Sequence, residues 1–384
     1  MRIAASDEGV WLIGDHSFTR LPSWAVTRTN TPRRMVRGAL SVLEKVGKPP
    51  ASSSAYHLTV LTTTNCNLGC AYCFQNVGAA KPGAFRPPRI DAKSLSPDSA
   101  REIADFTRRH MRSAGTEELD LLIFGGEPLL VPNTVLSLLE IMKPLGLQRA
   151  RMISNGVGLD IGLSRKLESA GLDEVQITFD GQQTDHDAVR HDHRGNGTYS
   201  AIVKNVAAAQ GATDLRFNIR INVTDDNHRG IHGLIADLGS RLEAGRCKVH
   251  IALVDATGAG FTGVPKRQDI AEEFAAWHIT ALENGFDVEP PAVDSRCVYC
   301  DKRRGVEGAV VNADGVLYSC WDSAGQAAYD VGNAAEGYYP DKRVDDRWVS
   351  CGYQGREQRG QGTGELIDRA AVAVLEWKSA RNAR

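Results

Sequence analysis

Short β-branched runs alternate with amphipathic stretches through the middle of this 384-residue chain, and no other feature limits its fold as strongly. This alternation is typical of βα units, in which each helix returns the chain to a parallel sheet. The expected strands are 58–63, 119–124, 151–154, 174–179, 216–223 and 248–254. The expected helices lie near 97–112, 133–143, 161–170, 199–209, 229–241 and 268–284. Six units are too few for a closed eight-stranded barrel, so we expect an α/β fold with an open, partial (β/α)6 TIM barrel.

The segments on either side of the barrel follow different patterns. The N-terminal segment predicts a small lead-in, with a hairpin near 7–13, a helix over 35–46 and a proline- and serine-rich linker. After Pro290 glycines and cysteines become frequent, and Asp314-Gly315 between two apolar runs predicts a hairpin in a separate module. Apolar residues near the C-terminus predict a packed helix. The expected domains are 1–55, 56–286, 287–362 and 363–384.

The charge balance excludes a global attraction to nucleic acid. The chain has 45 Lys and Arg against 47 Asp and Glu, which gives a formal net charge of -2, so no overall positive field draws in a polyanion. No apolar run approaches the roughly 18 residues of a membrane-spanning helix, and the first residues lack the apolar core of a secretion signal. We therefore expect a cytoplasmic protein with no nucleic-acid and no membrane partner.

Most of the eight cysteines fall into two groups, and the first group directly follows the first expected strand. Cys66, Cys70 and Cys73 have the spacing Cys-x3-Cys-x2-Cys. Clustered cysteines in a cytosolic chain favour metal ligands over disulfides. Three thiolates hold three irons of a four-iron cluster and leave the fourth open, whereas a structural zinc site takes four closed ligands. Zinc binding, or burial as scattered core cysteines, is the alternative.

This loop resembles the cysteine motif of the radical S-adenosylmethionine (radical SAM) superfamily, in which an aromatic residue, here Tyr72, precedes the last cysteine. The resemblance implies a barrel of the radical SAM type and a [4Fe-4S] cluster on the three cysteines. It also implies that S-adenosyl-L-methionine (SAM) binds the open iron, with Tyr72 and Phe74 among the residues at the cofactor.

A Gly125-Gly126-Glu127-Pro128 segment ends the second expected strand. Two glycines let a ligand approach the backbone closely, and a carboxylate accepts hydrogen bonds from an ammonium group. The segment resembles the superfamily's Gly-Gly-Glu-Pro motif, and the resemblance implies that it holds the amino group of SAM. A plain strand-to-helix turn is the alternative.

Polar residues also end the third and fourth expected strands. Ser154 and Asn155 follow the third strand, and Thr178 lies in the fourth, with Arg190 shortly after it. These segments resemble those that reach the ribose and carboxylate of SAM in the superfamily, although a turn or capping role is the alternative for each residue. The basic stretch from His186 to Arg194 predicts a solvated loop, except for Arg190, or else a contact with an acidic peptide.

The second cysteine group lies in the module after the barrel. Cys297, Cys300 and Cys320 are followed by a single later cysteine, Cys351. The pattern resembles the SPASM and twitch modules of radical SAM enzymes, and the resemblance implies one auxiliary [4Fe-4S] cluster with these four ligands. Zinc is the alternative. The isolated Cys247 predicts a small buried hydrophobic residue.

The resemblance implies an oxidoreductase that cleaves SAM reductively to a 5'-deoxyadenosyl radical, with electrons from a flavodoxin- or ferredoxin-type reductant. The auxiliary cluster would accept the electron that remains on the substrate radical. Asp322, two residues after Cys320, would be the catalytic proton acceptor. A carboxylate that caps the following turn is the alternative.

Radical SAM enzymes with such modules mostly modify ribosomally made peptides, so we expect a precursor peptide as substrate and a maturase that crosslinks or epimerises it. The lead-in is too short for a whole leader-binding domain, so leader recognition would come from elsewhere or not be needed. The alternatives are a dehydrogenase of a small molecule, an enzyme that oxidises a protein side chain as sulfatase-maturing enzymes do, and a non-catalytic iron-sulfur protein.

Overall fold

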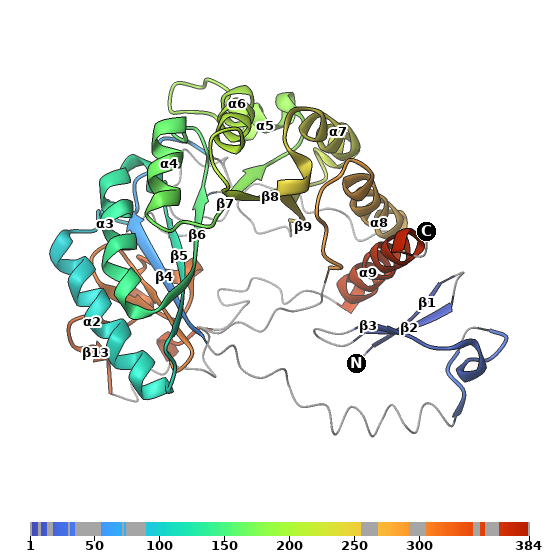
Figure 1. Ribbon diagram of the computed structural model, residues 1–384, viewed down its shortest axis with the longest axis horizontal. Helices are drawn as coiled ribbons and strands as arrows, with labels where there is room; N and C mark the ends of the chain where they lie inside the picture. The colour runs from blue at the N-terminus through green and yellow to red at the C-terminus, as the bar shows by residue number, and fades with distance from the viewer. Residues whose placement is uncertain are drawn as a thin grey trace.

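The computed structural model describes residues 2–6, 9–13, 18–29, 31–34, 55–70, 73, 90–254, 268–291, 305–340, 346–349 and 361–382. A curved sheet lies at its centre, with helices on the outer side (Figure 1). Some sequence predictions fall outside the described residues and stay predictions. They concern the helix at 35–46, Tyr72, Phe74, Cys297, Cys300 and Cys351.

Six parallel strands form the barrel and follow one another in sequence order across the sheet. They are β4 Ala55–Thr63, β5 Glu118–Gly125, β6 Leu147–Ser154, β7 Glu174–Phe179, β8 Arg216–Val223 and β9 Cys247–Leu253. Each expected strand is present, although β4 and β6 begin earlier than expected. The predicted partial barrel is therefore confirmed, and the carboxyl ends of its strands lie along one edge, where βα folds place their ligands.

Helices connect the strands and cover the outer face of the sheet (Figure 1). They are α2 Pro97–Ala114, α3 Pro132–Met142, α4 Ile161–Ser169, α5 Gln183–Val189, α6 Tyr199–Gln210, α7 Ile231–Arg241 and α8 Gln268–Glu283. The short α5 is absent from the sequence prediction because its mostly polar residues carry no helical apolar period. None of the described helices is long and apolar enough to span a bilayer.

The local sequence explains where a helix such as α2 begins and ends. The Ser96 side chain accepts a hydrogen bond from the Ser99 backbone N–H, and Pro97 occupies the first helical position, where no N–H is needed. Gly115 ends the helix in the left-handed conformation, at φ 69°. The helix therefore runs in a fixed position between β4 and β5.

The two faces of the barrel sheet differ in polarity. Alternate residues of a strand point to opposite faces, and one set, including Leu121, Met152 and Ile177, packs under the helices in the main hydrophobic core. Full burial of one such side chain contributes about 1.5–3 kcal/mol, so this outer face holds the barrel together. The concave face of β6 and β7 carries polar residues such as Arg151 and Gln176.

The hairpin predicted after the barrel is present, as β10 Gly308–Val311 and β11 Val316–Tyr318, with Gly315 in the turn at φ 82°. It continues the barrel sheet, because β10 pairs in parallel with β4. β12 Asp330–Asn333 and β13 Gly337–Tyr338 extend the sheet to ten strands among the described residues. The pairing satisfies the backbone groups of β4 that would otherwise form a free edge. The expected division into domains stays a prediction.

The two chain ends pack together beside α8 (Figure 1). The predicted N-terminal hairpin is present as β1 Arg2–Ser6 and β2 Gly9–Ile13, and β3 Phe18–Arg20 adds a third strand that the sequence prediction lacks. The predicted C-terminal helix is α9 Gln361–Asn382. Trp11 packs against α9 at Val372 and donates its indole N–H to Glu376 at 3.1 Å.

Candidate active site

The first cysteine group lies where β4 ends, at the carboxyl edge of the barrel sheet. Cys70 is buried, while Cys66 and Cys73 are partly exposed. Burial first, and then the charges of Glu127, Cys70 and Cys73, raise the pKa of the Cys66 thiol to about 12, against the opposing effect of the Leu68 hydrogen bond. The Cys66 sulfur accepts the Leu68 backbone N–H at 3.4 Å. The three thiols therefore lie close enough to interact through their charges.

Gly125 and Gly126 are required by the chain's own backbone. A Cβ atom on Gly125 would lie 2.1 Å from the Thr63 carbonyl oxygen, and one on Gly126 would lie 2.2 Å from that of Asn65. Gly125 also has φ +142°, which side chains other than glycine rarely adopt. Any larger residue would displace the segment that leads into Cys66. The close approach that the sequence attributes to a ligand is thus made by the cysteine loop itself.

The Glu127 carboxylate is fully buried and accepts three hydrogen bonds from the chain. Oε1 accepts the Leu129 backbone N–H at 2.9 Å and the Ser154 hydroxyl at 2.8 Å, and Oε2 accepts the Asn155 backbone N–H at 2.6 Å. Burial raises the pKa of Glu127, and these donors oppose the shift. Glu127 therefore joins the ends of β5 and β6, and its predicted contact with SAM stays a prediction.

Asn155 extends this junction to the cysteine loop. Its Nδ2 donates to Asn67 Oδ1 at 2.8 Å and lies 3.9 Å from the Cys66 sulfur. Its Oδ1 accepts the Val157 backbone N–H at 3.0 Å, which is the turn role left open by the sequence. The structure thus places Asn155 against the cysteine loop, and Ser154 joins the same junction through Glu127.

Arg190 lies on another side of the cysteine loop and is buried. Burial raises the pKa of Cys70, and the charge of Arg190 opposes that shift. The Arg190 guanidinium donates to Asp180 at 3.5 Å, and Thr178 is buried two residues before Asp180. The sequence analysis did not select Asp180, although an Asp-Gly pair at the end of a strand signals it.

The loop after α5 packs on the cysteine loop. Gly69 donates its backbone N–H to the His191 carbonyl at 2.9 Å, and His193 Nε2 lies 3.0 Å from the Cys66 carbonyl oxygen. The prediction of a solvated stretch is wrong at its start, because His186 is completely buried and burial lowers its pKa to about 3. Helix α5, which the sequence prediction lacks, places this side chain in the core.

The family model of the Radical SAM superfamily matches residues 60–227. That span contains the cysteine loop, the Gly125–Pro128 segment and the ends of β6 and β7, which the structure brings to one edge of the sheet. Residues 60–227 are therefore a radical SAM domain. The superfamily implies SAM and a [4Fe-4S] cluster as cofactors, and it supports an enzymatic role.

Curated relatives of the radical SAM domain act on different substrates. The GTP 3',8-cyclase of Moorella thermoacetica is 31% identical over 166 residues, which cover 43% of this chain and 46% of that protein. The GTP 3',8-cyclase of Mycobacterium sp. (strain KMS) is 26% identical over 320 residues, 77% of this chain and 83% of that protein. The PqqA peptide cyclase of Gluconobacter oxydans is 28% identical over 233 residues, which cover 59% of this chain and 58% of that protein. The first match thus spans less than half of that relative.

Solved structures confirm the radical SAM α/β fold. Native anSMEcpe with bound AdoMet has a TM-score of 0.60 and 13% identity, and the match covers 85% of this chain and 98% of that chain. Native anSMEcpe with bound AdoMet and Cp18Cys peptide has a TM-score of 0.59 and 13% identity, and the match covers 85% of this chain and 99% of that chain. At such identities the similarity speaks for the fold alone.

The cysteines of the radical SAM domain supply thiolates, the ligands that hold iron-sulfur clusters. Across the described ranges, no three His, Cys, Asp or Glu side chains are placed to hold one ion together. A four-iron cluster takes each thiolate on a separate iron, so its ligands stand further apart than those of zinc. Cys66, Cys70 and Cys73 lie on one loop and interact through their charges, so all three can contribute ligands to one site. Iron must displace protons from these thiols when it binds.

Cys320 is the described member of the second cysteine group, and it lies near the radical SAM site. It is partly exposed and precedes the short helix η6 Trp321–Ser323. The Trp321 ring lies 6.0 Å from that of Phe124, next to Gly125 at the end of β5. Asp322 is half-buried within η6, so this segment borders the carboxyl edge of the barrel. The roles of Cys320 as a ligand and of Asp322 in proton transfer stay predictions.

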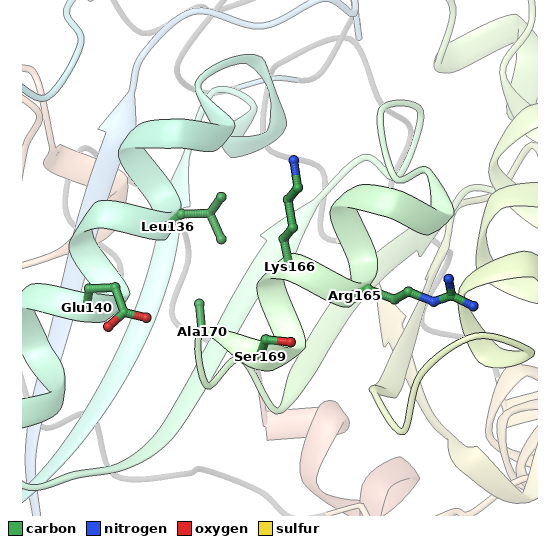
Figure 2. A pocket seen from close by; sticks show the side chains of 6 residues that line it. All are labelled: Leu136, Glu140, Arg165, Lys166, Ser169 and Ala170. Carbon is green, nitrogen blue, oxygen red and sulfur yellow. The ribbon is translucent and has the colours of Figure 1, made fainter.

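A surface pocket lies apart from the cysteine loop. Figure 2 shows side chains from α3 and α4 around it, and none is a predicted site residue. They are Leu136, Glu140, Arg165, Lys166, Ser169 and Ala170. The pocket lies in the outer helical layer, away from the edge of the barrel sheet that carries the predicted site residues.

Proposed function

We propose that this chain is a radical SAM enzyme that oxidatively modifies a ribosomally made peptide, by crosslinking or epimerising it. The observation that carries the radical chemistry is the junction of Cys66, Glu127 and Asn155 at the ends of three neighbouring strands. The PqqA peptide cyclase among the relatives supports a peptide substrate.

Residues of the radical SAM domain have distinct tasks in this proposal. When bound, SAM and the clusters supply a hydrogen-abstracting 5'-deoxyadenosyl radical and an acceptor for the electron that the substrate gives up. Cys66, Cys70 and Cys73 bind the first cluster, and the Gly125–Pro128 segment, Ser154, Asn155, Thr178 and Arg190 orient SAM. Asp322 accepts the proton that the oxidised substrate releases. A flavodoxin- or ferredoxin-type protein supplies the initial electron.

A small-molecule substrate is the second candidate. It is favoured by the GTP 3',8-cyclase from Mycobacterium sp., whose match covers 77% of this chain.

The peptide proposal predicts a short precursor-peptide reading frame beside the gene. It also predicts that the co-expressed peptide changes in mass or residue stereochemistry only when this enzyme is active. Turnover of a small molecule without any peptide would contradict the peptide proposal.

SAM cleavage tests the radical chemistry directly. We expect anaerobically reconstituted protein to form 5'-deoxyadenosine and methionine from SAM when dithionite is present, and none without a reductant. Chromatography of the quenched mixture measures both products. A protein that binds iron but never cleaves SAM would support the non-catalytic alternative instead.

Iron content tests the auxiliary cluster. With two four-iron clusters, the reconstituted chain should contain about eight irons. Substitution of Cys297, Cys300 and Cys320 by alanine should lower this to about four and retain SAM cleavage, because the first cluster has its own ligands. Iron and zinc are measured on the same sample by elemental analysis. About four irons in the unaltered chain, or zinc at this position, would contradict the auxiliary cluster.

A further inference from the structure

Thr198 at the start of α6 uses its hydroxyl outside its own helix. A threonine in this position usually accepts a backbone N–H of the helix with its side-chain oxygen. The Thr198 hydroxyl instead donates to the backbone carbonyl of Arg190 at 2.7 Å. Asp187 on α5 accepts the N–H groups at the start of the helix, from Thr198 at 2.7 Å and Tyr199 at 2.9 Å. The hydroxyl is therefore available to hold Arg190.

His186 links Thr198 to Asp180. The Asp180 backbone N–H donates to His186 Nδ1 at 3.4 Å, and His186 Nε2 lies 3.2 Å from the Thr198 hydroxyl oxygen. Because Nδ1 is an acceptor, the ring proton is on Nε2, which donates to Thr198. Burial, and then the charge of Arg190, lower the pKa of His186 to about 3, so the ring stays neutral. A series of hydrogen bonds thus runs from Asp180 through His186 and Thr198 to Arg190.

Packing fixes the ring in the middle of this series. The ring centroids of Phe179 and Tyr199 lie 5.4 Å and 5.5 Å from that of His186. His186 is completely buried, and both aromatic residues belong to the main core. A close-packed imidazole cannot turn without displacing its neighbours. The hydrogen bonds of His186 therefore hold Asp180 and Thr198 in fixed positions.

The two ends of the series meet again next to the cysteine loop. The Arg190 guanidinium donates to the Asp180 carboxylate at 3.5 Å, and both residues are buried. Leu68 on the cysteine loop forms an antiparallel bridge with Asp192. Two residues further along each segment, this register places Cys70 opposite Arg190. Burial raises the pKa of the Cys70 thiol and the charge of Arg190 opposes that shift, so the guanidinium acts on this ligand position.

We propose that His186 and Thr198 are positioning residues that hold the Arg190 guanidinium beside Cys70, where its positive charge raises the reduction potential of the cluster. A reduced cluster carries one more negative charge than an oxidised one, so a fixed cation nearby stabilises the reduced state. The same position keeps the guanidinium available to SAM. This inference deepens the proposed function and rests on it for the cluster on the cysteine loop and for the contact of Arg190 with SAM.

The test is a redox titration of the anaerobically reconstituted enzyme with dithionite, followed by electron paramagnetic resonance. The signal that changes on addition of SAM belongs to the cluster that binds SAM. Arg190→Gln removes the charge and should lower the reduction equilibrium constant at least about tenfold, which is about 59 mV for one electron. Thr198→Val changes no charge, yet it should lower the potential in the same direction and weaken SAM binding, because it releases Arg190.

A double variant shows whether Thr198 acts through Arg190. In the presence of Arg190→Gln, Thr198→Val should shift the potential no further, because the charge that it displaces is already absent. A general loosening of the structure would shift the potential equally in both backgrounds. His186→Leu, which also changes no charge, should lower the potential as Thr198→Val does.

Matched controls lose the same kind of hydrogen bond elsewhere in the core. Thr107 on α2 is buried and donates its hydroxyl to the Ile103 carbonyl at 2.7 Å. His278 on α8 is buried, and its Nδ1 lies 2.7 Å from the Phe274 carbonyl oxygen. Thr107→Val and His278→Leu should lower the thermal unfolding midpoint and leave the cluster potential unchanged. Iron content and thermal unfolding are measured on every variant.

The inference is overturned if Thr198→Val leaves the potential unchanged, if its shift persists alongside Arg190→Gln, or if Thr107→Val shifts the potential equally. The crystal structure of Thr198→Val tests the positioning step without any cluster, and a guanidinium still 3.5 Å from Asp180 would overturn it. SAM cleavage by the unaltered enzyme tests the proposed function separately. A cluster whose potential depends on Thr198, in a protein that never cleaves SAM, would support the positioning role and refute the radical enzyme.

Discussion

Substitution of Cys66, Cys70 and Cys73 together by alanine should reduce 5'-deoxyadenosine formation to background. These thiols supply every protein ligand proposed for the cluster that binds SAM, and no other described cysteine lies in this loop. The iron content should fall by about four per chain, because a four-iron cluster without ligands is not retained. Product analysis with dithionite and elemental analysis of iron measure the two effects.

Cys247→Ala is the matched control for the triple variant. Cys247 is completely buried, as the sequence predicts, and accepts a hydrogen bond from the Gln210 amide at 3.3 Å. It belongs to the core under the helices, so its loss should lower stability and leave SAM cleavage and iron content unchanged. Persistent 5'-deoxyadenosine formation in the triple variant would show that the cysteine loop is not the cluster site.

The barrel was predictable because its signals are local. Each barrel strand carries its own run of apolar and β-branched residues, and helices such as α2 carry caps that can be read from adjacent residues. The cysteine spacing is likewise contained within eight residues, from Cys66 to Cys73. Fold class and the first cluster loop therefore follow from short stretches of sequence.

Other features depend on contacts between distant parts of the chain. The pairing of β10 with β4 joins residues near 310 to residues near 60. The sequence of the hairpin does not indicate which strand it pairs with. His186 looks like part of a basic loop, but α5 turns it into the core. The glycines at 125 and 126 indicate that another group lies close to the backbone. Only the structure shows that this group is the backbone of Thr63 and Asn65.

Glu127→Gln should lower the free energy of unfolding by about 1–3 kcal/mol. The carboxylate accepts hydrogen bonds at both oxygens, from Leu129 and Ser154 at one and from Asn155 at the other. A carboxamide presents N–H donors at one of these positions, so at least one buried donor loses its acceptor. The junction between β5 and β6 should loosen, and SAM should bind more weakly as a consequence. Chemical denaturation and SAM titration measure the two effects.

The same variant separates two interpretations of Glu127. If the carboxylate mainly contacts the ammonium group of SAM, as the sequence pattern indicates, Glu127→Gln would weaken SAM binding and leave the SAM-free protein as stable as before. If it mainly positions the loops, stability falls even without SAM. Glu140→Gln is the control, because this exposed carboxylate on α3 pairs with Lys143 at 2.8 Å and such a pair contributes at most about 1 kcal/mol. Equal stability of Glu127→Gln and Glu140→Gln would refute the positioning role, since three buried hydrogen bonds cannot be disturbed without cost.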